Sequence, residues 1–397
     1  MAEWKEYTVA DVISTVIDYR GKTPKKLGGD WSDSGYRALS AKNIKTGKIV
    51  QPDSIRYVAE DMYRCWMKEE VQKEDILITS EAPFGQIYYW DSDEKIVLSQ
   101  RLFAVRINQQ FYPKYIYFYM TSSFFQTELD GRATGTTVVG LRQPELLKCK
   151  IFAPDYQEQK RIADTLWCLE QKINNNEAIN NNLVQQAQAI FANEFLSLQS
   201  LPDGWKQASL IDIADYLNGL AMQKYRPSAD EIGIPVLKIK ELRQGCCDDN
   251  SELCSPSIKS DYIIHDGDVI FSWSGSLLVD FWCGGICGLN QHLFKVSSNK
   301  YDKWFYYAWT KHHLDRFIAV AADKATTMGH IKRDELAKAE VLIPNEADYK
   351  RIGALLQPIY DLIISNRIEN KKLAETRDSL LPKLMSGEID MSEVDYE

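Results

Sequence analysis

The sequence lacks any run of about 18 or more apolar residues, the length that a membrane-spanning helix needs, so we expect no transmembrane segment and no membrane partner. Residues 1–6 also lack the basic stretch followed by an apolar stretch that marks a secretory signal. Cysteine is sparse: eight cysteines at irregular spacings in 397 residues exclude a small disulfide-bonded scaffold. We therefore expect a cytoplasmic protein with reduced thiols.

The composition is that of a globular chain with sizeable cores, because 45% of the residues are apolar, 26% are charged and 11% are aromatic. The net charge of −9 would argue against a nucleic-acid partner if the charge were evenly spread. It is not evenly spread, since the last ten residues carry five acids and no base, whereas residues 20–48 carry eight bases and two acids. The chain is acidic on average and basic in places.

The two halves of the chain are a tandem repeat. Lys-Arg-Ile at 160–162 recurs at 350–352, and Gln-Arg-Leu-Phe at 100–103 corresponds to Gln-His-Leu-Phe at 291–294. In each half, short β-branched runs between Gly, Pro and Asp residues give way to a long segment without strand signals. This pattern predicts a mixed α/β (α+β) fold in which two tandem domains are each followed by a long helix. The expected parts are a first domain at 1–154, a central helix at 155–200, a second domain at 201–343, a C-terminal helix at 344–388 and an acidic tail at 389–397, with a shorter helix at 113–126 inside the first domain.

Both long segments carry a coiled-coil seam, in which the inward positions alternate at spacings of four and three. Each seam has two asparagines at its middle. If the helices pair in antiparallel fashion, Asn176 and Asn180 meet Asn370 and Asn366, so that each buried amide finds a polar partner. The alternative is two unrelated amphipathic helices, each packed on its own domain. The seams consist of Ile162, Leu166, Leu169, Ile173, Asn176, Asn180, Leu183, Ala187 and Ile190, and of Ile352, Leu356, Ile359, Ile363, Asn366, Asn370, Leu373, Arg377 and Leu380.

Pro358 lies inside the second seam. Proline has no N–H group and its ring clashes with the preceding turn, so we expect the helix to kink or restart there.

Signals of catalysis are absent from the sequence. It contains no Walker phosphate loop, no Gly-x-Gly-x-x-Gly after a strand, and no Asn-Pro-Pro-Tyr tetrapeptide of an amino-methyltransferase. Asp155, Glu158 and Lys160 imitate the acid–acid–lysine pattern of nucleases, but they all open one helix instead of converging from separate elements. Cys283 and Cys287, near Cys254, His265 and His292, have the wrong spacing for a zinc knuckle. We predict a non-catalytic chain that holds no metal.

Two related, locally basic and aromatic-rich domains suit the reading of an extended DNA duplex, because lysine and arginine neutralise phosphates while amide and guanidinium groups read base edges. A solvated surface charge explains each residue taken singly better than DNA binding does, so the prediction depends on the cluster and not on its single members. In the first domain the candidates are Lys22, Lys25, Lys26, Lys42 and Lys45 for phosphates and Asn43, Gln100, Arg101, Arg142 and Gln143 for bases. In the second they are Lys224, Arg226, Lys238, Lys240 and Arg243 for the backbone and Asn290, Gln291, His292, Lys332 and Arg333 for bases or phosphates.

The two helical segments also resemble a known family. Lys-Arg-Ile-Ala at 160–163, preceded by Pro154, and the ending Arg-Asp-Ser-Leu-Leu-Pro-Lys-Leu-Met-Ser-Gly-Glu-Ile at 377–389 are similar to the conserved helices of specificity subunits of type I restriction–modification systems. The resemblance covers essentially the whole chain, with weaker matches at 75–78 and 233–237. It implies a protein that binds a two-part, asymmetric site in double-stranded DNA, with one half-site per domain.

The resemblance further implies that the helices dock two methyltransferase subunits, and that restriction–translocase subunits join the full complex. S-adenosylmethionine, ATP and Mg²⁺ would then belong to those partners, and the chain itself would hold no cofactor. The alternatives are the recognition subunit of a type IIB-like or modification-only system, a fused nuclease or methyltransferase with degenerate motifs, and a coiled-coil scaffold with two protein-binding heads.

Overall fold

The structure is a computed structural model that describes residues 4–135, 139–323 and 333–391. The chain divides into two compact units, each described by itself below: unit 1 consists of residues 1–171 and 374–397, and unit 2 of residues 172–373. The predicted mixed α/β fold, with two tandem domains and long antiparallel helices, is confirmed. No helix in the described part of the chain combines the length and the hydropathy needed to cross a membrane.

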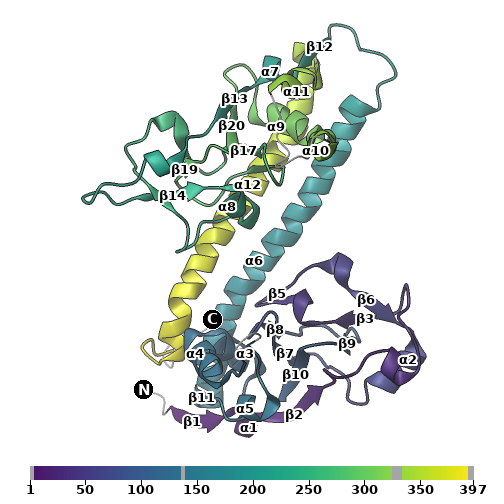
Figure 1. The fold of residues 1–397 in the computed structure, drawn as a ribbon, viewed down its shortest axis with the longest axis vertical. Helices are drawn as coiled ribbons and strands as arrows, with labels where there is room; N and C mark the ends of the chain where they lie inside the picture. The colour runs from purple at the N-terminus through teal and green to yellow at the C-terminus, as the bar shows by residue number, and fades with distance from the viewer. Residues whose placement is uncertain (1–3, 136–138, 324–332, 392–397) are drawn as a thin grey trace. The chain divides into compact units, whose positions relative to one another are not determined.

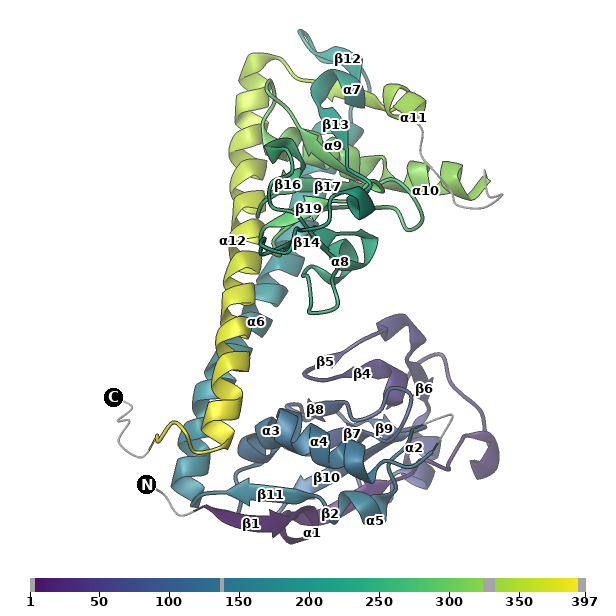
Figure 2. The ribbon, with the colours of Figure 1, turned by 60° about the vertical axis from the view of Figure 1, so that its left-hand side comes forward.

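Unit 1 is organised around a four-stranded antiparallel sheet. The apolar run at Ile76–Thr79 forms a strand, β7, that is buried on both faces, since all four of its residues are buried. Figure 2 shows helices α3 (Pro113–Thr121) and α4 (Ser123–Arg132) lying across one face. In spatial order the strands are β2 (Ile13–Asp18), β10 (Leu102–Ile107), β7 (Ile76–Thr79) and β8 (Ile87–Tyr89).

The single helix expected over 113–126 is wrong, because the chain breaks at Ser122, which adopts an extended conformation. The Ser122 hydroxyl accepts a hydrogen bond from the Phe125 N–H and caps the start of α4.

Smaller elements complete unit 1. The strands β1 (Lys5–Thr8) and β11 (Lys150–Ala153) pair with each other beside α1 (Val9–Val12) and α5 (Gln143–Leu146). A second apolar cluster contains the buried Trp66 and Trp90. The remaining elements are η1 (Lys25–Leu27), β3 (Tyr36–Leu39), η2 (Ala41–Asn43), β4 (Ile44–Lys45), β5 (Lys48–Ile49), η3 (Pro52–Ser54), β6 (Arg56–Val58), α2 (Glu60–Trp66) and β9 (Val97–Leu98).

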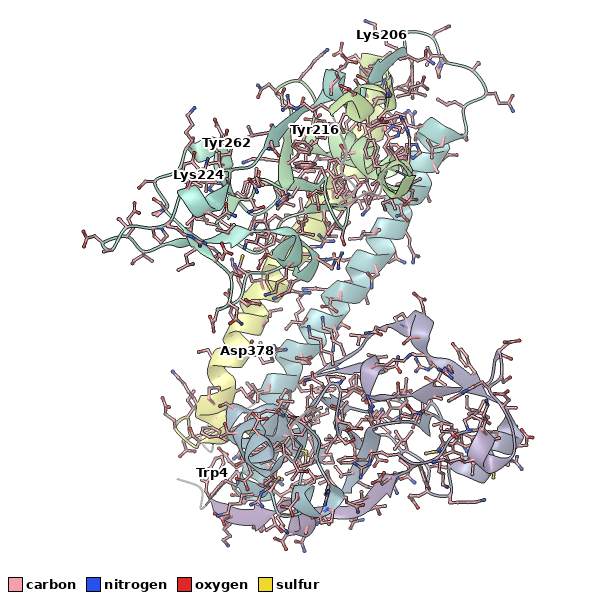
Figure 3. All side chains as sticks on the ribbon, viewed as in Figure 1. Trp4, Lys206, Tyr216, Lys224, Tyr262 and Asp378 are labelled. Atoms are coloured by element: carbon pink, nitrogen blue, oxygen red, sulfur yellow. The ribbon has the colours of Figure 1, made fainter. Side chains whose placement is uncertain are left out.

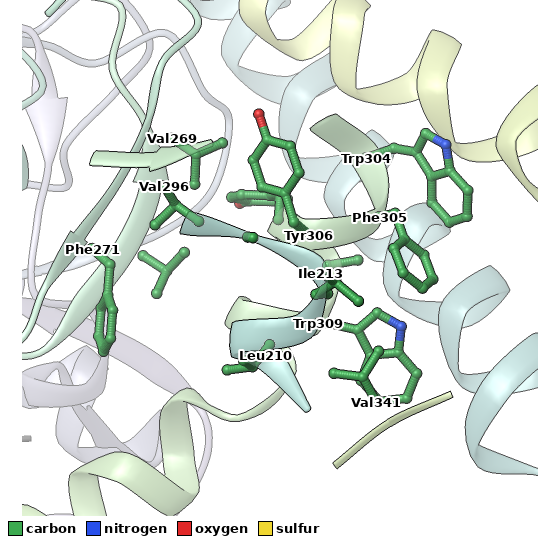
Figure 4. Packing of buried hydrophobic residues seen from close by; sticks show 14 of the residues in the cluster. Leu210, Ile213, Val269, Phe271, Val296, Trp304, Phe305, Tyr306, Trp309 and Val341 are labelled. Carbon is green, nitrogen blue, oxygen red and sulfur yellow. The ribbon is translucent and has the colours of Figure 1, made fainter. Parts of the chain in front are cut away.

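Unit 2 repeats the plan of unit 1. Its main sheet has the strand order β13 (Asp215–Asn218), β20 (Leu293–Ser297), β17 (Val269–Ser272) and β18 (Leu278–Phe281), which corresponds to β2–β10–β7–β8. Trp304, Phe305 and Trp309 of α9 pack in the core of this unit with Leu210 and Val341, as Figure 4 shows. The duplication seen in the sequence is therefore a duplication of topology.

The bounds of the unit 2 strands are β12 (Lys206–Ser209), β13 (Asp215–Asn218), β14 (Ile234–Leu237), β15 (Leu253–Cys254), β16 (Ile263–Ile264), β17 (Val269–Ser272), β18 (Leu278–Phe281), β19 (Cys287–Leu289), β20 (Leu293–Ser297) and β21 (Glu340–Ile343). The bounds of its shorter helices are η4 (Ala192–Leu196), α7 (Leu210–Ile213), η5 (Met222–Lys224), α8 (Ile239–Gln244), η6 (Ser260–Tyr262), α9 (Lys303–His312), α10 (Leu314–Asp323) and α11 (Arg333–Ala337).

The two long helices, α6 (Tyr156–Phe191) and α12 (Glu346–Met385), pair in antiparallel fashion. Within unit 2 they lie side by side in Figures 1 and 2, where α6 is teal and α12 yellow. Asn176 Nδ2 donates to Asn370 Oδ1 at 2.8 Å, and Asn366 Nδ2 donates to Asn180 Oδ1 at 2.9 Å. These are the two amide pairs that the antiparallel arrangement predicts. Within unit 1 the Arg377 guanidinium of α12 pairs with the buried Glu170 of α6.

Both helices also complete the apolar cores. The main core of unit 1 contains Leu166 of α6 and Leu384 of α12, and the core of unit 2 contains Ala187 and Leu356. Neither helix is an appendage, because each unit buries a part of both.

Pro358 does not interrupt α12, which runs through it from Glu346 to Met385, so the predicted restart is wrong. Pro358 and Ala354 both lie on the exposed side of the helix. The Ala354 carbonyl that loses its N–H partner therefore faces water, which can satisfy it.

Replacing Asn366 by leucine should lower the free energy of unfolding by about 1–3 kcal/mol, because the Asn180 amide would lose its partner inside the helix pair. The double variant Asn180→Leu/Asn366→Leu should recover most of the loss, since two apolar side chains then face each other. Urea denaturation of the full chain, followed by circular dichroism, measures both. A double variant no more stable than the single one would contradict this account.

A second prediction concerns acid stability. Hydrogen bonds of 2.8 and 2.7 Å from the Arg351 guanidinium hold the pKa of Glu194 below its ordinary value. A lowered folded-state pKa contributes stability that is present above the unfolded-state pKa and is lost as pH falls through the folded one. Between about pH 6 and pH 3 the native chain should therefore lose more unfolding free energy than Glu194→Gln. The same loss in both proteins would show that this ion pair adds no stability.

Candidate nucleic-acid interface

A cleft opens in unit 1 at one end of the strands of the main sheet. Strands β2 and β7 run antiparallel to β10, so the carboxyl ends of β2 and β7 lie next to the start of β10 at this end of the sheet. The cleft has a volume of about 670 Å³. Four cations and two carboxylates are among its lining residues, which are Asp18, Tyr19, Arg20, Gly21, Lys22, Ser80, Glu81, Arg101, Thr134, Gly140, Leu141 and Arg142.

A second, smaller cleft of about 200 Å³ shares Arg101 with the first. It contains three cations and no carboxylate. Its lining residues are Trp31, Ala38, Ser40, Ala41, Lys42, Ser54, Arg56, Ala82, Ser99, Gln100 and Arg101. We call the residues that line the two clefts the basic face of unit 1. Its net positive charge suits a polyanion such as the DNA backbone.

Acidic side chains orient two arginines of the basic face. The Asp18 carboxylate accepts bonds of 2.9 and 2.6 Å from Arg20, whose third nitrogen donates to the Leu141 carbonyl oxygen at 3.1 Å. Arg101 Nε lies 2.9 Å from Glu81 Oε1, and 49% of the Arg101 side chain remains exposed. Both guanidinium groups are thus held in place while part of each faces solvent.

The basic face collects five of the ten residues predicted in the first domain: Lys22, Lys42, Gln100, Arg101 and Arg142. Lys26 borders the face, since its Nζ atom donates to the carbonyl oxygen of Gly21 at 2.8 Å. The other predicted cations, Lys25 and Lys45, are exposed but line neither cleft, and Gln143 is half-buried at the start of α5.

The prediction that Asn43 contacts bases is wrong. Asn43 is fully buried, and its carboxamide donates to Ser54 Oγ at 2.9 Å and accepts from Ser40 Oγ at 2.8 Å. It fixes the turn that carries Lys42 and cannot reach a ligand.

Sequence reasoning missed Arg20, Arg56 and Trp31 of the basic face. The Arg56 guanidinium lies 4.9 Å from the centre of the Trp31 ring, a cation–π contact that brings a flat aromatic surface to the second cleft. Arg20 belongs to the basic segment of the sequence and could have been chosen on that ground. Nothing local in the sequence connects Arg56 with Trp31.

In unit 2 several predicted cations are already paired with acids. Lys238 and Arg226 both contact Glu252, and Lys240 contacts Asp248 at 3.1 Å. The hydrogen bond from Lys238 lowers the pKa of Glu252, and that from Lys240 lowers the pKa of Asp248. Lys224, labelled in Figure 3, and Arg243 are exposed.

Most of the other unit 2 candidates lie at the end of the main sheet that corresponds to the cleft end of the unit 1 sheet. His292 is half-buried, and its Nδ1 atom lies 3.1 Å from Ser274 Oγ. Gln291 is half-buried beside it. Arg333 is exposed and donates to the Tyr216 carbonyl oxygen at 3.0 Å. Lys332 lies outside the described residues.

The prediction that Asn290 contacts bases or phosphates is wrong, because Asn290 is only 4% exposed. Its side-chain oxygen accepts a hydrogen bond from the His292 N–H at 3.2 Å. Asn290 therefore shapes the turn that presents His292.

The acids that imitate a nuclease pattern have structural roles. Asp155 accepts hydrogen bonds from the N–H groups of Gln157 and Glu158 and caps the start of α6. Glu158 is buried and accepts the Met391 N–H at 2.8 Å. Within the described residues, no three His, Cys, Asp or Glu side chains are grouped so that they could hold a metal ion.

Known proteins resemble the chain along most of its length. The type I restriction enzyme MjaIX specificity subunit of Methanocaldococcus jannaschii is 25% identical over 81% of this chain and 79% of its own. The EcoKI specificity subunit of Escherichia coli is 23% identical over 96% of this chain and 89% of its own. A crystal structure of a type I restriction–modification S subunit from M. genitalium shares the fold, with a TM-score of 0.60 and 14% identity over 96% of both chains.

A family model described as the type I restriction modification DNA specificity domain matches this sequence twice, at residues 1–185 and 202–375. The two matches correspond to the two copies of the repeat, and together they cover most of the chain. The chain therefore belongs to the family of type I restriction–modification DNA specificity proteins.

Proposed function

We propose that the chain is the DNA sequence-recognition subunit of a type I restriction–modification complex. In this proposal it binds a two-part, asymmetric site in double-stranded DNA, with one half-site for each unit. The observation that carries the proposal is the basic face of unit 1, where residues from several separate segments of the chain converge around two clefts that share Arg101. Basic clefts that also present amide and guanidinium groups can both hold a duplex and read it.

The family resemblance supports a set of partners for this subunit. Two methyltransferase subunits dock on the paired helices α6 and α12, and restriction–translocase subunits join the full complex. S-adenosylmethionine, ATP and Mg²⁺ are held by those partners, and the chain contributes binding only. The complex works in the cytoplasm, where it meets chromosomal and incoming DNA.

Reversing two charges of the basic face should weaken DNA binding by the complex assembled with methyltransferase subunits. For the double variant Lys42→Glu/Arg142→Glu we expect an affinity loss of about 10- to 100-fold at moderate salt, because phosphate contacts dominate affinity. The slope of log affinity against log salt should also fall by about 2, one for each lost contact.

The matched control is Arg64→Glu/Lys68→Glu, which makes the same change in charge at two exposed residues, Arg64 on α2 and Lys68 just after it, that line neither cleft. Equal losses in both double variants would indicate attraction by net charge alone and would contradict a specific interface. Full DNA binding by both would favour a protein-interaction scaffold.

The purified chain alone, given S-adenosylmethionine, Mg²⁺ and DNA, should neither transfer methyl groups nor cut the duplex. The physical reason is that Asp155 and Glu158 are committed to a helix cap and to the Met391 N–H. Radiolabelled methyl transfer and plasmid cleavage provide the measurements. Activity that disappears in Asp155→Asn or Glu158→Gln would establish a fused enzyme instead.

A further inference from the structure

The segment that leads into strand β10 in unit 1 is nearly identical in sequence to the segment that leads into the corresponding strand β20 in unit 2. Gln-Arg-Leu-Phe at 100–103 leads into β10, and Gln-His-Leu-Phe at 291–294 leads into β20. The register agrees as well, since Leu102 lies opposite Thr79 of β7 and Leu293 lies opposite Ser272 of β17. Arg101 and His292 therefore occupy equivalent positions, each directly before the first residue of a central strand of its sheet. Of the four positions in this segment, only the one occupied by Arg101 in the first repeat and by His292 in the second differs between the repeats.

The partners of these two side chains are equivalent too. Glu81, which contacts Arg101, lies two residues after Thr79, and Ser274, which contacts His292, lies two residues after Ser272. Each repeat thus presents one exposed or half-buried side chain and one residue that positions it. The duplication kept this arrangement and changed its chemistry.

In unit 1 the geometry of Arg101 suits the recognition of a guanine. The backbone of Arg101 is in the left-handed region, with φ of +63°, a conformation that residues other than glycine rarely adopt. Such strained conformations are concentrated at functional sites, where they position a side chain for its ligand. Arg101 also lines both clefts. Because Glu81 engages Nε, the two terminal nitrogens are left to donate in parallel, as the O6 and N7 atoms of guanine require.

In unit 2 the same place carries an imidazole with a different set of contacts. Its Nδ1 atom is next to the buried Ser274 hydroxyl, and Gln291 Nε2 lies 3.4 Å from its Nε2. The Trp273 ring, whose Nε1 donates to Asn218 at 3.0 Å, lies 6.3 Å from the His292 ring. An imidazole cannot make the two parallel bonds of a guanidinium, so this unit would contact its half-site through a different set of hydrogen bonds.

We infer that Arg101 and His292 are the specificity-determining residues of their units: Arg101 recognises a guanine in one half-site, with Glu81 as its positioning residue, and His292 selects a base pair in the other half-site. The inference rests on the proposed function, since it requires that both units bind DNA. It accounts for an asymmetric target, because two copies of one framework carry unlike side chains at the same reading position.

The test is to sequence methylated adenines in genomic DNA from cells that make this chain together with its methyltransferase subunits. The native chain should give a two-part motif with a guanine in one half-site. Arg101→Ala should reduce the preference for that guanine by about 10- to 100-fold and leave the other half-site unchanged. His292→Ala should relax one position of the other half-site only.

Four further variants distinguish base recognition from effects on folding and from effects of charge alone. Arg101→Lys keeps the charge but loses the parallel donors, so it should relax the same position as Arg101→Ala. Glu81→Gln should relax that position partially, and adding it to Arg101→Ala should change nothing more. Lys42→Ala, a matched control on the basic face, should lower the extent of methylation and keep the motif.

Two kinds of failure are distinguishable. If the native chain directs no methylation motif, the proposed function itself is overturned. If it directs a two-part motif that stays intact in both Arg101→Ala and Arg101→Lys, or that loosens in both half-sites at once, the assignment of Arg101 is overturned while the proposed function stands.

Discussion

The antiparallel pairing of α6 and α12 is the constraint on which the rest of the molecule depends. A helix that paired only along its seam could be removed without loss to the domains. Here Leu166 and Leu384 belong to the core of unit 1, and Ala187 and Leu356 belong to the core of unit 2. Each domain needs both helices in the correct register, so a shift of the helix pair would open two cores as well as the seam.

Polar groups fix that register more sharply than apolar ones do. Leucine and isoleucine tolerate sliding because their contacts are non-directional, whereas an amide without its partner is costly in a buried layer. In unit 2 the pairs Asn176–Asn370 and Asn180–Asn366 can form together in one alignment only. In unit 1 the buried Glu170, paired with Arg377, imposes a similar requirement.

The sequence predicted the helices well because the information there is local. A spacing of four and three repeats along the segment itself, and the expected amide pairs follow from it. The candidate site was predicted less well, because a polar residue looks the same in sequence whether it faces a ligand or the interior. Asn43 and Asn290 were both expected to contact DNA, yet both are buried and bonded to neighbouring turns.

Features that depend on tertiary contacts escaped the sequence in the same way. The approach of Arg56, at the start of β6, to Trp31 joins two segments that no periodicity connects. The continuity of α12 through Pro358 depends on which side of the helix faces water. Conversely, the repeat did locate Arg101 and His292, since a matching turn with one altered residue can be read directly from the letters.

The division of the chain into units also affects when each unit can fold during translation. Unit 1 consists of residues 1–171 and 374–397, so its core lacks Leu384 and Met385 until unit 2 has been synthesised. At roughly 5–20 residues per second, translation of the intervening unit takes on the order of ten seconds or more. During that time the nascent first domain holds exposed apolar surface on the ribosome, whereas unit 2 is contiguous and can close as soon as α12 has emerged. Unit 1 can therefore complete its core only after the residues of unit 2 have been synthesised.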